Sequence, residues 1–188
     1  MASTQVSTAT ALPRSGRWEL DPAHTTVEFS ARHLGLAKVR GRFGAFSASI
    51  NVGDSLADSG FEATIDAATI ETRQDFRDQH LRSPDFLDVE RFKDIRFVST
   101  RIEPRGDDRY DVHGDLTIRD ITKPAVFEVE YHGEVDDPQS ETKRAGFSGT
   151  LEFDREAFGM TWNGAIEIGG FVGKKVKVEI EAEALLAA

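Results

Sequence analysis

Residues 110–119 read Tyr-Asp-Val-His-Gly-Asp-Leu-Thr-Ile-Arg, and this stretch carries the main signal for the fold. Apolar or small side chains occupy every second position, and polar or charged side chains occupy the positions between them. Because successive side chains of a β-strand point to opposite faces of a sheet, this period of two predicts a strand with one buried face.

The same alternation recurs along the chain after Trp18. The further runs cover residues 27–31, 61–65, 95–97, 125–131, 147–153 and 172–182. Turn-forming residues separate the runs, as at Gly53-Asp54 and Asn163-Gly164. Regularly spaced strands with such turns indicate an all-β domain, built as a sandwich or a barrel.

One segment near the middle of the chain, residues 72–89, loses the strand period. Side chains there recur at three- and four-residue spacing, as on the face of a helix. Ser83 followed by Pro84 predicts the N-cap and first position of a helix. We therefore expect a long sheet with one helical insertion, arranged as a closed or nearly closed barrel with a plug or lid. The apolar residues of this insertion are expected to cover the mouth of the barrel or line the upper part of its interior: Phe76, Leu81, Phe86 and Leu87.

The length of 188 residues fits one domain, which we place at residues 17–186. Residues 1–16 form a Ser/Thr/Ala-rich tract that predicts a disordered N-terminal tail. This tract lacks the apolar core of a secretory signal, and no later run is long enough for a transmembrane helix. We expect a cytoplasmic protein without an integral membrane segment.

The composition excludes several classes of partner and site. There are no cysteines, so disulfides, Cys-ligated metals and thiol nucleophiles are excluded. The net charge of −10 argues against a nucleic-acid partner, because phosphate binding needs a basic face. The same charge argues against peripheral docking on anionic lipid, which favours clustered Lys and Arg.

The apolar side chains are dominated by phenylalanine, with 13 Phe against 2 Tyr and 2 Trp. Phe supplies a large apolar area without a polar group that needs a partner. This composition fits either a filled core or an apolar channel, and it does not decide between them. Small residues on the apolar faces, such as Ala63, Gly114 and Gly149, would leave room for a channel.

Four residues invite a catalytic interpretation, because imidazole and carboxylate ligands suit zinc or iron: His24, His33, Asp78 and His80. No pair among them has the spacing of a recognised metal motif. The alternative is that these side chains cap loops and pair with their neighbours. We therefore expect no metal and no cofactor.

Read in order, several stretches resemble the YceI-like family, polyisoprenoid-binding proteins with a lipocalin-like barrel. The resemblance spans Trp18 to about Ala184, and two turns depart from the family pattern, at Lys93-Asp94 and at Asp120. The stretches that carry it are Trp18 to Thr25, Val39 to Phe43, Arg77 to Asp88, Ile95 to Ser99, Gly114 to Ile118 and Asp154 to Met160.

The resemblance implies an antiparallel barrel of about eight strands that holds a long apolar ligand without catalysis. A polyprenyl chain, an isoprenoid quinone and a polyprenyl phosphate are the candidate ligands, and a homodimer is left open. We expect the apolar faces of the strands and the helical insertion to contact this ligand. The predicted ligand-binding residues are Phe29, Phe43, Phe46, Phe86, Phe97, Leu116, Phe127, Val129, Phe147, Leu151, Phe153 and Ile180.

A second group of polar residues is expected near a ligand headgroup or at the lid: His24, His33, Arg77, Asp78 and His80. Two other functions remain open at this point. One is a hydrolase or metal-dependent enzyme that uses His24, His33, Asp78 and His80. The other is a stress-related scaffold protein whose barrel has a filled core.

Overall fold

The computed structural model describes residues 12–137, 141–163 and 172–187, and in them strands predominate. The longest strands lie in the second half of the chain. The strands are β1 (Gly16–Leu20), β2 (Thr26–His33), β3 (Ala37–Phe43), β4 (Phe46–Val52), β5 (Gly60–Asp66), β6 (Ile70–Glu71), β7 (Asp94–Gly106), β8 (Arg109–Ile118), β9 (Ile121–Asp136), β10 (Lys143–Asp154) and β11 (Val172–Leu186).

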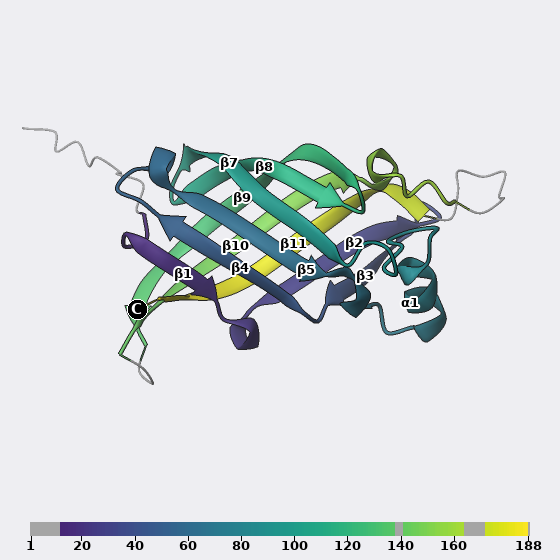
Figure 1. Cartoon of the computed structure of the whole chain (residues 1–188), viewed down its shortest axis with the longest axis horizontal. Coiled ribbons are helices and arrows are strands. Elements are labelled where there is room, and N and C mark those ends of the chain that lie inside the picture. Colours follow the sequence, from purple (N-terminus) through teal and green to yellow (C-terminus); the bar gives the residue numbers. More distant parts are fainter. Residues whose placement is uncertain (1–11, 138–140, 164–171, 188) are drawn as a thin grey trace, which may run out of the picture.

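The described strands close into one antiparallel barrel with eight positions, in the order β1, β4, β5, β7, β8, β9, β10 and β11 (Figure 1). Closure comes from β11, which pairs with β10 on one side and with β1 on the other. The three remaining strands lengthen the barrel wall beyond short breaks in the strands. β2 continues β1 along β11, β3 continues β4, and β6 continues β5. The predicted all-β barrel of about eight strands is confirmed.

The alternation in the sequence matches the two faces of the wall. In β8 the buried positions are Tyr110, Val112, Gly114, Leu116 and Ile118, and the side chains between them are exposed or half-buried. Buried residues of the other strands join them in one hydrophobic cluster inside the barrel. Because the strand period is two, this register fixes which side chains face the interior.

The helical insertion contains α1 (Asp75–Arg82), which is shorter than the predicted segment. The predicted N-cap at Ser83 is wrong, because Ser83 is the C-cap of α1 and donates its backbone N–H to the His80 carbonyl. The true N-cap is Gln74, whose side chain accepts from the backbone N–H of Arg77. Pro84 follows the C-cap Ser83 and favours its extended conformation, so it marks the end of a helix instead of the start of one.

The helix α1 lies at one end of the barrel, which we call the helix end (Figure 1). The turn between β2 and β3 lies at this end too, and the start of β1 and the end of β11 lie at the opposite end, the far end. In the described part of the chain, no helix is long and apolar enough to cross a membrane.

Candidate ligand-binding site

The barrel interior contains two apolar cavities, one toward each end. The far-end cavity has a volume of about 130 Å³, and residues such as Leu12, Tyr110 and Tyr131 line it. The helix-end cavity has a volume of about 140 Å³, and Leu81, Phe86 and other residues line it. Each is close in size to an engineered apolar cavity of roughly 150 Å³ that binds benzene. The two cavities share six wall residues: Val27, Phe61, Ala63, Ile65, Phe127 and Ile180.

Three phenylalanines lie where the two cavities meet. The ring of Phe97 lies 5.2 Å from that of Phe127 and 5.9 Å from that of Phe61, centroid to centroid. The rings of Phe61 and Phe127 are 6.4 Å apart. These are ordinary contact distances for aromatic pairs, so the rings form one cluster across the interior. A ligand that occupies both cavities must pass this cluster.

The structure places all twelve predicted ligand-binding residues on the walls of these cavities. Contact of these residues with a ligand stays a prediction. Phe46, Val129 and Phe147 line the far-end cavity, and Phe127 and Ile180 line both cavities. The other seven line the helix-end cavity: Phe29, Phe43, Phe86, Phe97, Leu116, Leu151 and Phe153.

The three small residues expected to leave room for a channel have different roles. Ala63 lines both cavities and Gly149 lines the far-end cavity. Gly114 instead makes room for a protein side chain, because a Cβ there would lie 2.5 Å from the Phe97 ring. The expectation for Gly114 was therefore wrong, since its missing side chain is replaced by that of Phe97.

The segment around α1 closes the helix end of the barrel. Leu81, Phe86 and Leu87 line the helix-end cavity, as expected for a plug or lid. Phe76 was expected to cover the mouth of the barrel as well, but 76% of its surface is exposed. This expectation was wrong, because Phe76 lies in the first turn of α1 on the face that points away from the interior.

Polar side chains fasten α1 to the end of β6. Asp78 is buried and accepts from the backbone N–H of Thr72 at 2.9 Å and from its hydroxyl. Arg77 donates to the hydroxyl and the carbonyl of the same residue. Arg82 donates to the carbonyls of Ala68 and Ile70. Two of the five predicted headgroup or lid residues thus attach α1 to the barrel wall.

His80 contacts the chain that follows α1 and the chain that follows β10; we call these two stretches, residues 83–93 and 155–163, the closing segments. Its Nε2 lies 2.8 Å from a carboxylate oxygen of Asp85, and its ring packs edge-on against Trp162 and Phe86. Trp162 and Phe86 also contact each other, with ring centroids 5.6 Å apart. The chain after β10 and the chain after α1 therefore meet over the helix-end cavity.

A buried arginine, Arg155, holds this junction together. Only 2% of its surface is exposed, and it begins the short 3-10 helix that follows β10. Its guanidinium donates to the carbonyls of Met160, Trp162, Val172 and Gly173. Burial lowers the pKa of Arg155 from its usual value, yet a guanidinium stays charged at neutral pH. One cation thus fixes the chain on both sides of residues 164–171 against the helix-end cavity.

Two buried tyrosines are the main polar groups near the far-end cavity. Burial raises the pKa of Tyr131 to about 12 and raises that of Tyr110 as well. Both phenols are therefore neutral at physiological pH and line an otherwise apolar wall. The alternation had placed both residues on the apolar faces of their strands.

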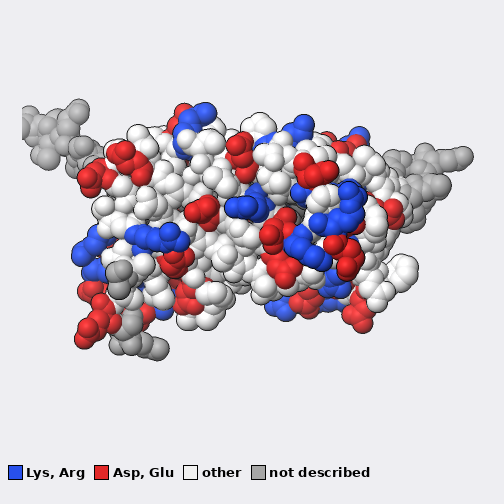
Figure 2. Space-filling view, viewed as in Figure 1, with Lys and Arg blue, Asp and Glu red and all other residues white. Residues whose placement is uncertain are grey.

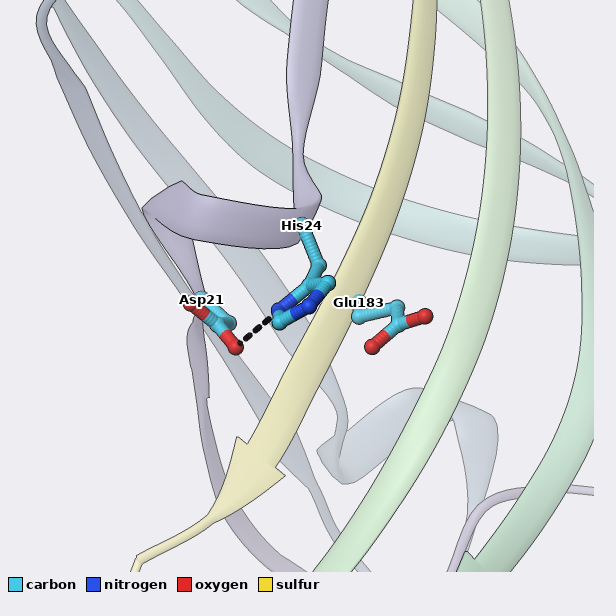
Figure 3. Close-up of side chains that lie close together, drawn as sticks. All are labelled: Asp21, His24 and Glu183. Atoms are coloured by element: carbon cyan, nitrogen blue, oxygen red, sulfur yellow. Dashed lines mark hydrogen bonds and ion pairs between the residues drawn. The ribbon is translucent and has the colours of Figure 1, made fainter.

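The structure does not bring the proposed metal-binding residues together. Among the described residues, the only group of three or more His or carboxylate side chains with mutually close ligand atoms is Asp21, His24 and Glu183 (Figure 3). His33 lies at the end of β2, opposite Val172 and Ala37 in the sheet, and belongs to no such group. The metal site proposed from His24, His33, Asp78 and His80 is not among the close groups of the described residues, and His24, Asp78 and His80 contact different partners.

The group around His24 is an ion-pair network. His24 Nδ1 lies 2.8 Å from the carboxylate of Asp21. Arg144 contacts Asp21 and Glu183, each at 2.7 Å, and Asp137 at 2.8 Å. The guanidinium supplies the positive charge that these carboxylates need, and it ties β10 to β11 and to the kink between β1 and β2.

This network predicts a pH dependence of stability. The hydrogen bond from Arg144 and the contact with His24 lower the pKa of Asp21 to about 2. A carboxyl whose folded-state pKa is depressed stabilises the fold above its unfolded pKa of about 3.9, and this contribution disappears as the pH falls toward 2. Asp21→Asn should therefore lower the free energy of unfolding near pH 6 by less than the unscreened limit of about 2.6 kcal/mol, because solvent screens part of the interaction, and by much less near pH 2.

Urea denaturation of both proteins between pH 2 and 6 measures this difference. Asp58→Asn is a control, because Asp58 contacts Ser55 and lies outside the Arg144 network. A difference between wild type and Asp21→Asn that stays constant with pH would contradict the prediction.

Sequence reasoning missed Arg155, Arg144 and Trp162. Arg155 follows the alternating run at residues 147–153, at the point where the period of two ends. A single cation beside this apolar run was the available signal. Arg144 and Trp162 carried no signal of this kind, because their partners are distant in sequence or lie beyond the strand pattern.

Comparisons with known proteins agree with this architecture. A family model described as the YceI-like domain matches residues 18–184. A UPF0312 protein of Staphylococcus aureus is 37% identical over 166 residues, covering 87% of this chain and 94% of that protein. The crystal structure of Burkholderia cenocepacia BcnA superposes with a TM-score of 0.76 at 23% identity, covering 87% of this chain and 98% of BcnA. A polyisoprenoid-binding domain from Saccharophagus degradans superposes with a TM-score of 0.67 at 13% identity, covering 90% and 98%.

Proposed function

This chain belongs to the YceI-like family, and from that premise we propose that it binds a long apolar ligand of the isoprenoid type inside its barrel, without catalysis. The observation that carries the proposal is the pair of apolar cavities that share a wall along one barrel. A filled core, as in a pure scaffold protein, would not leave this space. His24, Asp78 and His80 contact different partners instead of converging on one site, which favours binding over hydrolysis.

The energetics of burial support a chain-like ligand. Each methylene moved from water into an apolar interior contributes about 0.8 kcal/mol. A prenyl chain of several units therefore gains on the order of 10 kcal/mol before the costs of ordering and association. No charged anchor is needed for this affinity. The solved relative from Saccharophagus degradans is itself named a polyisoprenoid-binding domain, which supports the same class of ligand here.

Organic extraction of the purified protein followed by mass spectrometry tests the proposal. We expect one class of polyprenyl lipid, such as an isoprenoid quinone or a polyprenyl phosphate, at close to one equivalent per chain. Stripped protein should then bind a fluorescent prenyl analogue with the same stoichiometry. Failure to bind any prenyl probe in the stripped, folded protein would overturn the proposal.

The attachment of α1 leads to a prediction about ligand exchange. Asp78→Ala removes the buried acceptor of two Thr72 groups, so α1 should loosen and the off-rate of the prenyl analogue should rise by about tenfold. Asp75→Ala on the same helix is the matched control, because Asp75 is exposed. Stopped-flow displacement gives the off-rates and thermal melts give the stability. Equal off-rates in Asp78→Ala and wild type would show that α1 has a structural role only and does not control ligand exchange.

The two phenylalanines of the helical insertion should behave differently. Phe86 is 4% exposed and lines the helix-end cavity, whereas Phe76 is mostly exposed. Phe86→Leu should weaken retention of the prenyl analogue several-fold through lost contact area, and Phe76→Leu should leave retention unchanged. Equilibrium titration of both variants with the probe measures this. Equal affinities would show that Phe86 does not contact the ligand.

A further inference from the structure

The β2–β3 hairpin differs in charge from the rest of the chain. Residues 30–43 contain the four cations Arg32, Lys38, Arg40 and Arg42 and no Asp or Glu, in a protein with a net charge of −10. Figure 2 shows acidic and basic side chains interspersed over one face of the molecule. Glu28 of β2 lies opposite Arg42 in the sheet, and Glu71 contacts Arg42. The positive charge is therefore concentrated toward the tip of the hairpin, at Arg32, Lys38 and Arg40, where the net charge of the chain conceals it.

The tip of this hairpin exposes two leucines. Leu34 and Gly35 both have positive φ, 52° and 71°, and Leu36 N–H donates to the His33 carbonyl. A two-residue turn of this kind favours Asn-Gly, because positive φ is costly for other side chains. Here Leu34 takes the Asn position and is 40% exposed, and Leu36 is 77% exposed. A strained, exposed leucine opposes both stability and solubility, which indicates a functional role.

The cations flank this apolar tip on the outer face of the barrel. Lys38 and Arg40 are exposed and alternate with Val39, which is half-buried. Arg42 contacts Glu71. The hydrogen bond from Lys177 lowers the pKa of Glu179, and the charges of Lys38 and Arg40 add a smaller effect. Lys38 and Arg40 thus remain the cations closest to the tip along β3.

The hairpin also lies beside the opening through which we expect the ligand to pass. Phe29 and Ala31 of β2 and Phe43 of β3 line the helix-end cavity. The exposed Phe76 lies in the first turn of α1, at the same end of the barrel (Figure 1). Exposed apolar side chains, cations and the closing segments are thus gathered at one end of the barrel.

We propose that the β2–β3 hairpin docks the helix end of the barrel on an anionic lipid bilayer. Leu34 and Leu36 insert between the headgroups, and Lys38 and Arg40 contact the anionic lipids. Each contribution alone gives only marginal membrane binding, and stable anchoring takes two such signals together. Docking at this end lets an apolar ligand move between bilayer and barrel without crossing water. The docking itself does not depend on the identity of the ligand.

Flotation with vesicles tests the docking, using stripped protein, phosphatidylcholine vesicles, and vesicles with roughly one quarter phosphatidylglycerol. We expect binding to the anionic vesicles only, and its loss at high salt. Lys38→Gln with Arg40→Gln should weaken binding about 25-fold, since each cation near such a surface contributes about fivefold. Leu34→Asn with Leu36→Thr should weaken it by about tenfold or more.

The leucine variant carries its own control for folding. Asn at residue 34 suits the turn, so this variant should melt at or above the wild-type temperature while binding vesicles less well. Two variants at the far end serve as matched controls: Val135→Thr, which changes a 61% exposed side chain, and Arg105→Gln with Arg109→Gln. Both controls should bind vesicles as wild type does.

The results separate docking from ligand binding. The hairpin variants should bind the prenyl analogue in solution with wild-type affinity but take it up from anionic vesicles more slowly. The docking proposal would be overturned if the wild-type protein did not bind anionic vesicles, or if the hairpin variants bound them as well as wild type does. Neither result would affect the proposal that the barrel binds a prenyl chain.

Discussion

Ala63→Trp should abolish binding of the fluorescent prenyl analogue and leave the barrel folded. Ala63 lies on the wall shared by both cavities, next to the cluster of Phe61 and Phe127. An indole at this position fills space that a continuous chain must cross, so the affinity should fall by at least about 100-fold, or about 3 kcal/mol. The cost in stability should be smaller, about 1–3 kcal/mol, because the added side chain enters existing space.

Titration with the prenyl analogue and urea denaturation measure the two effects. Glu62→Trp is the matched control, because it adds the same side chain at the neighbouring, exposed position of β5. The control should bind the analogue as wild type does. Full affinity in Ala63→Trp would show that the ligand does not run through the junction of the cavities.

Arg155→Met should lower the free energy of unfolding by about 3–5 kcal/mol. Arg155 is buried and donates to four backbone carbonyls, and methionine would leave those carbonyls without this partner. The chain segments on both sides of residues 164–171 would lose their common attachment. The same variant should release the prenyl analogue faster, since these segments border the helix-end cavity.

Urea denaturation measures the stability of Arg155→Met against that of Arg101→Met. Arg101 is exposed and pairs with Glu103 on the surface, so its substitution should cost less than about 1 kcal/mol. Arg155→Lys should fall between wild type and Arg155→Met, because an ammonium has three donors and cannot span four carbonyls in fixed directions. A loss below 1 kcal/mol in Arg155→Met would show that the carbonyls find other partners.

The candidate site was partly visible in the sequence and partly not. Phe97 and Phe127 could be assigned to the interior, because strand alternation fixes the face of each side chain. Gly114 shows the limit of that reasoning. Its position on the inner face was clear, but only the packed structure reveals that the Phe97 ring takes up the space it leaves.

The polar residues show the same limit more strongly. Sequence spacing gave no distance between His24 and His80, and the fold places them in separate networks with Asp21 and Asp85. The net charge of −10 argued against docking on an anionic membrane. Residues 30–43, however, contain four Lys or Arg residues and no Asp or Glu. A net charge is a sum over the whole chain, whereas docking depends on which charges lie at one end of the molecule.

By itself, the sequence determined the class of fold, the inner faces of the strands and the family. These properties are local or periodic, because the pleat of a strand makes each side chain's face depend on its neighbours in sequence. Only the tertiary structure decided that the interior is divided into two cavities, that Arg155 fastens four carbonyls, and that the cationic hairpin lies beside the closing segments. These features depend on contacts between residues far apart in the chain, which form only when the barrel closes.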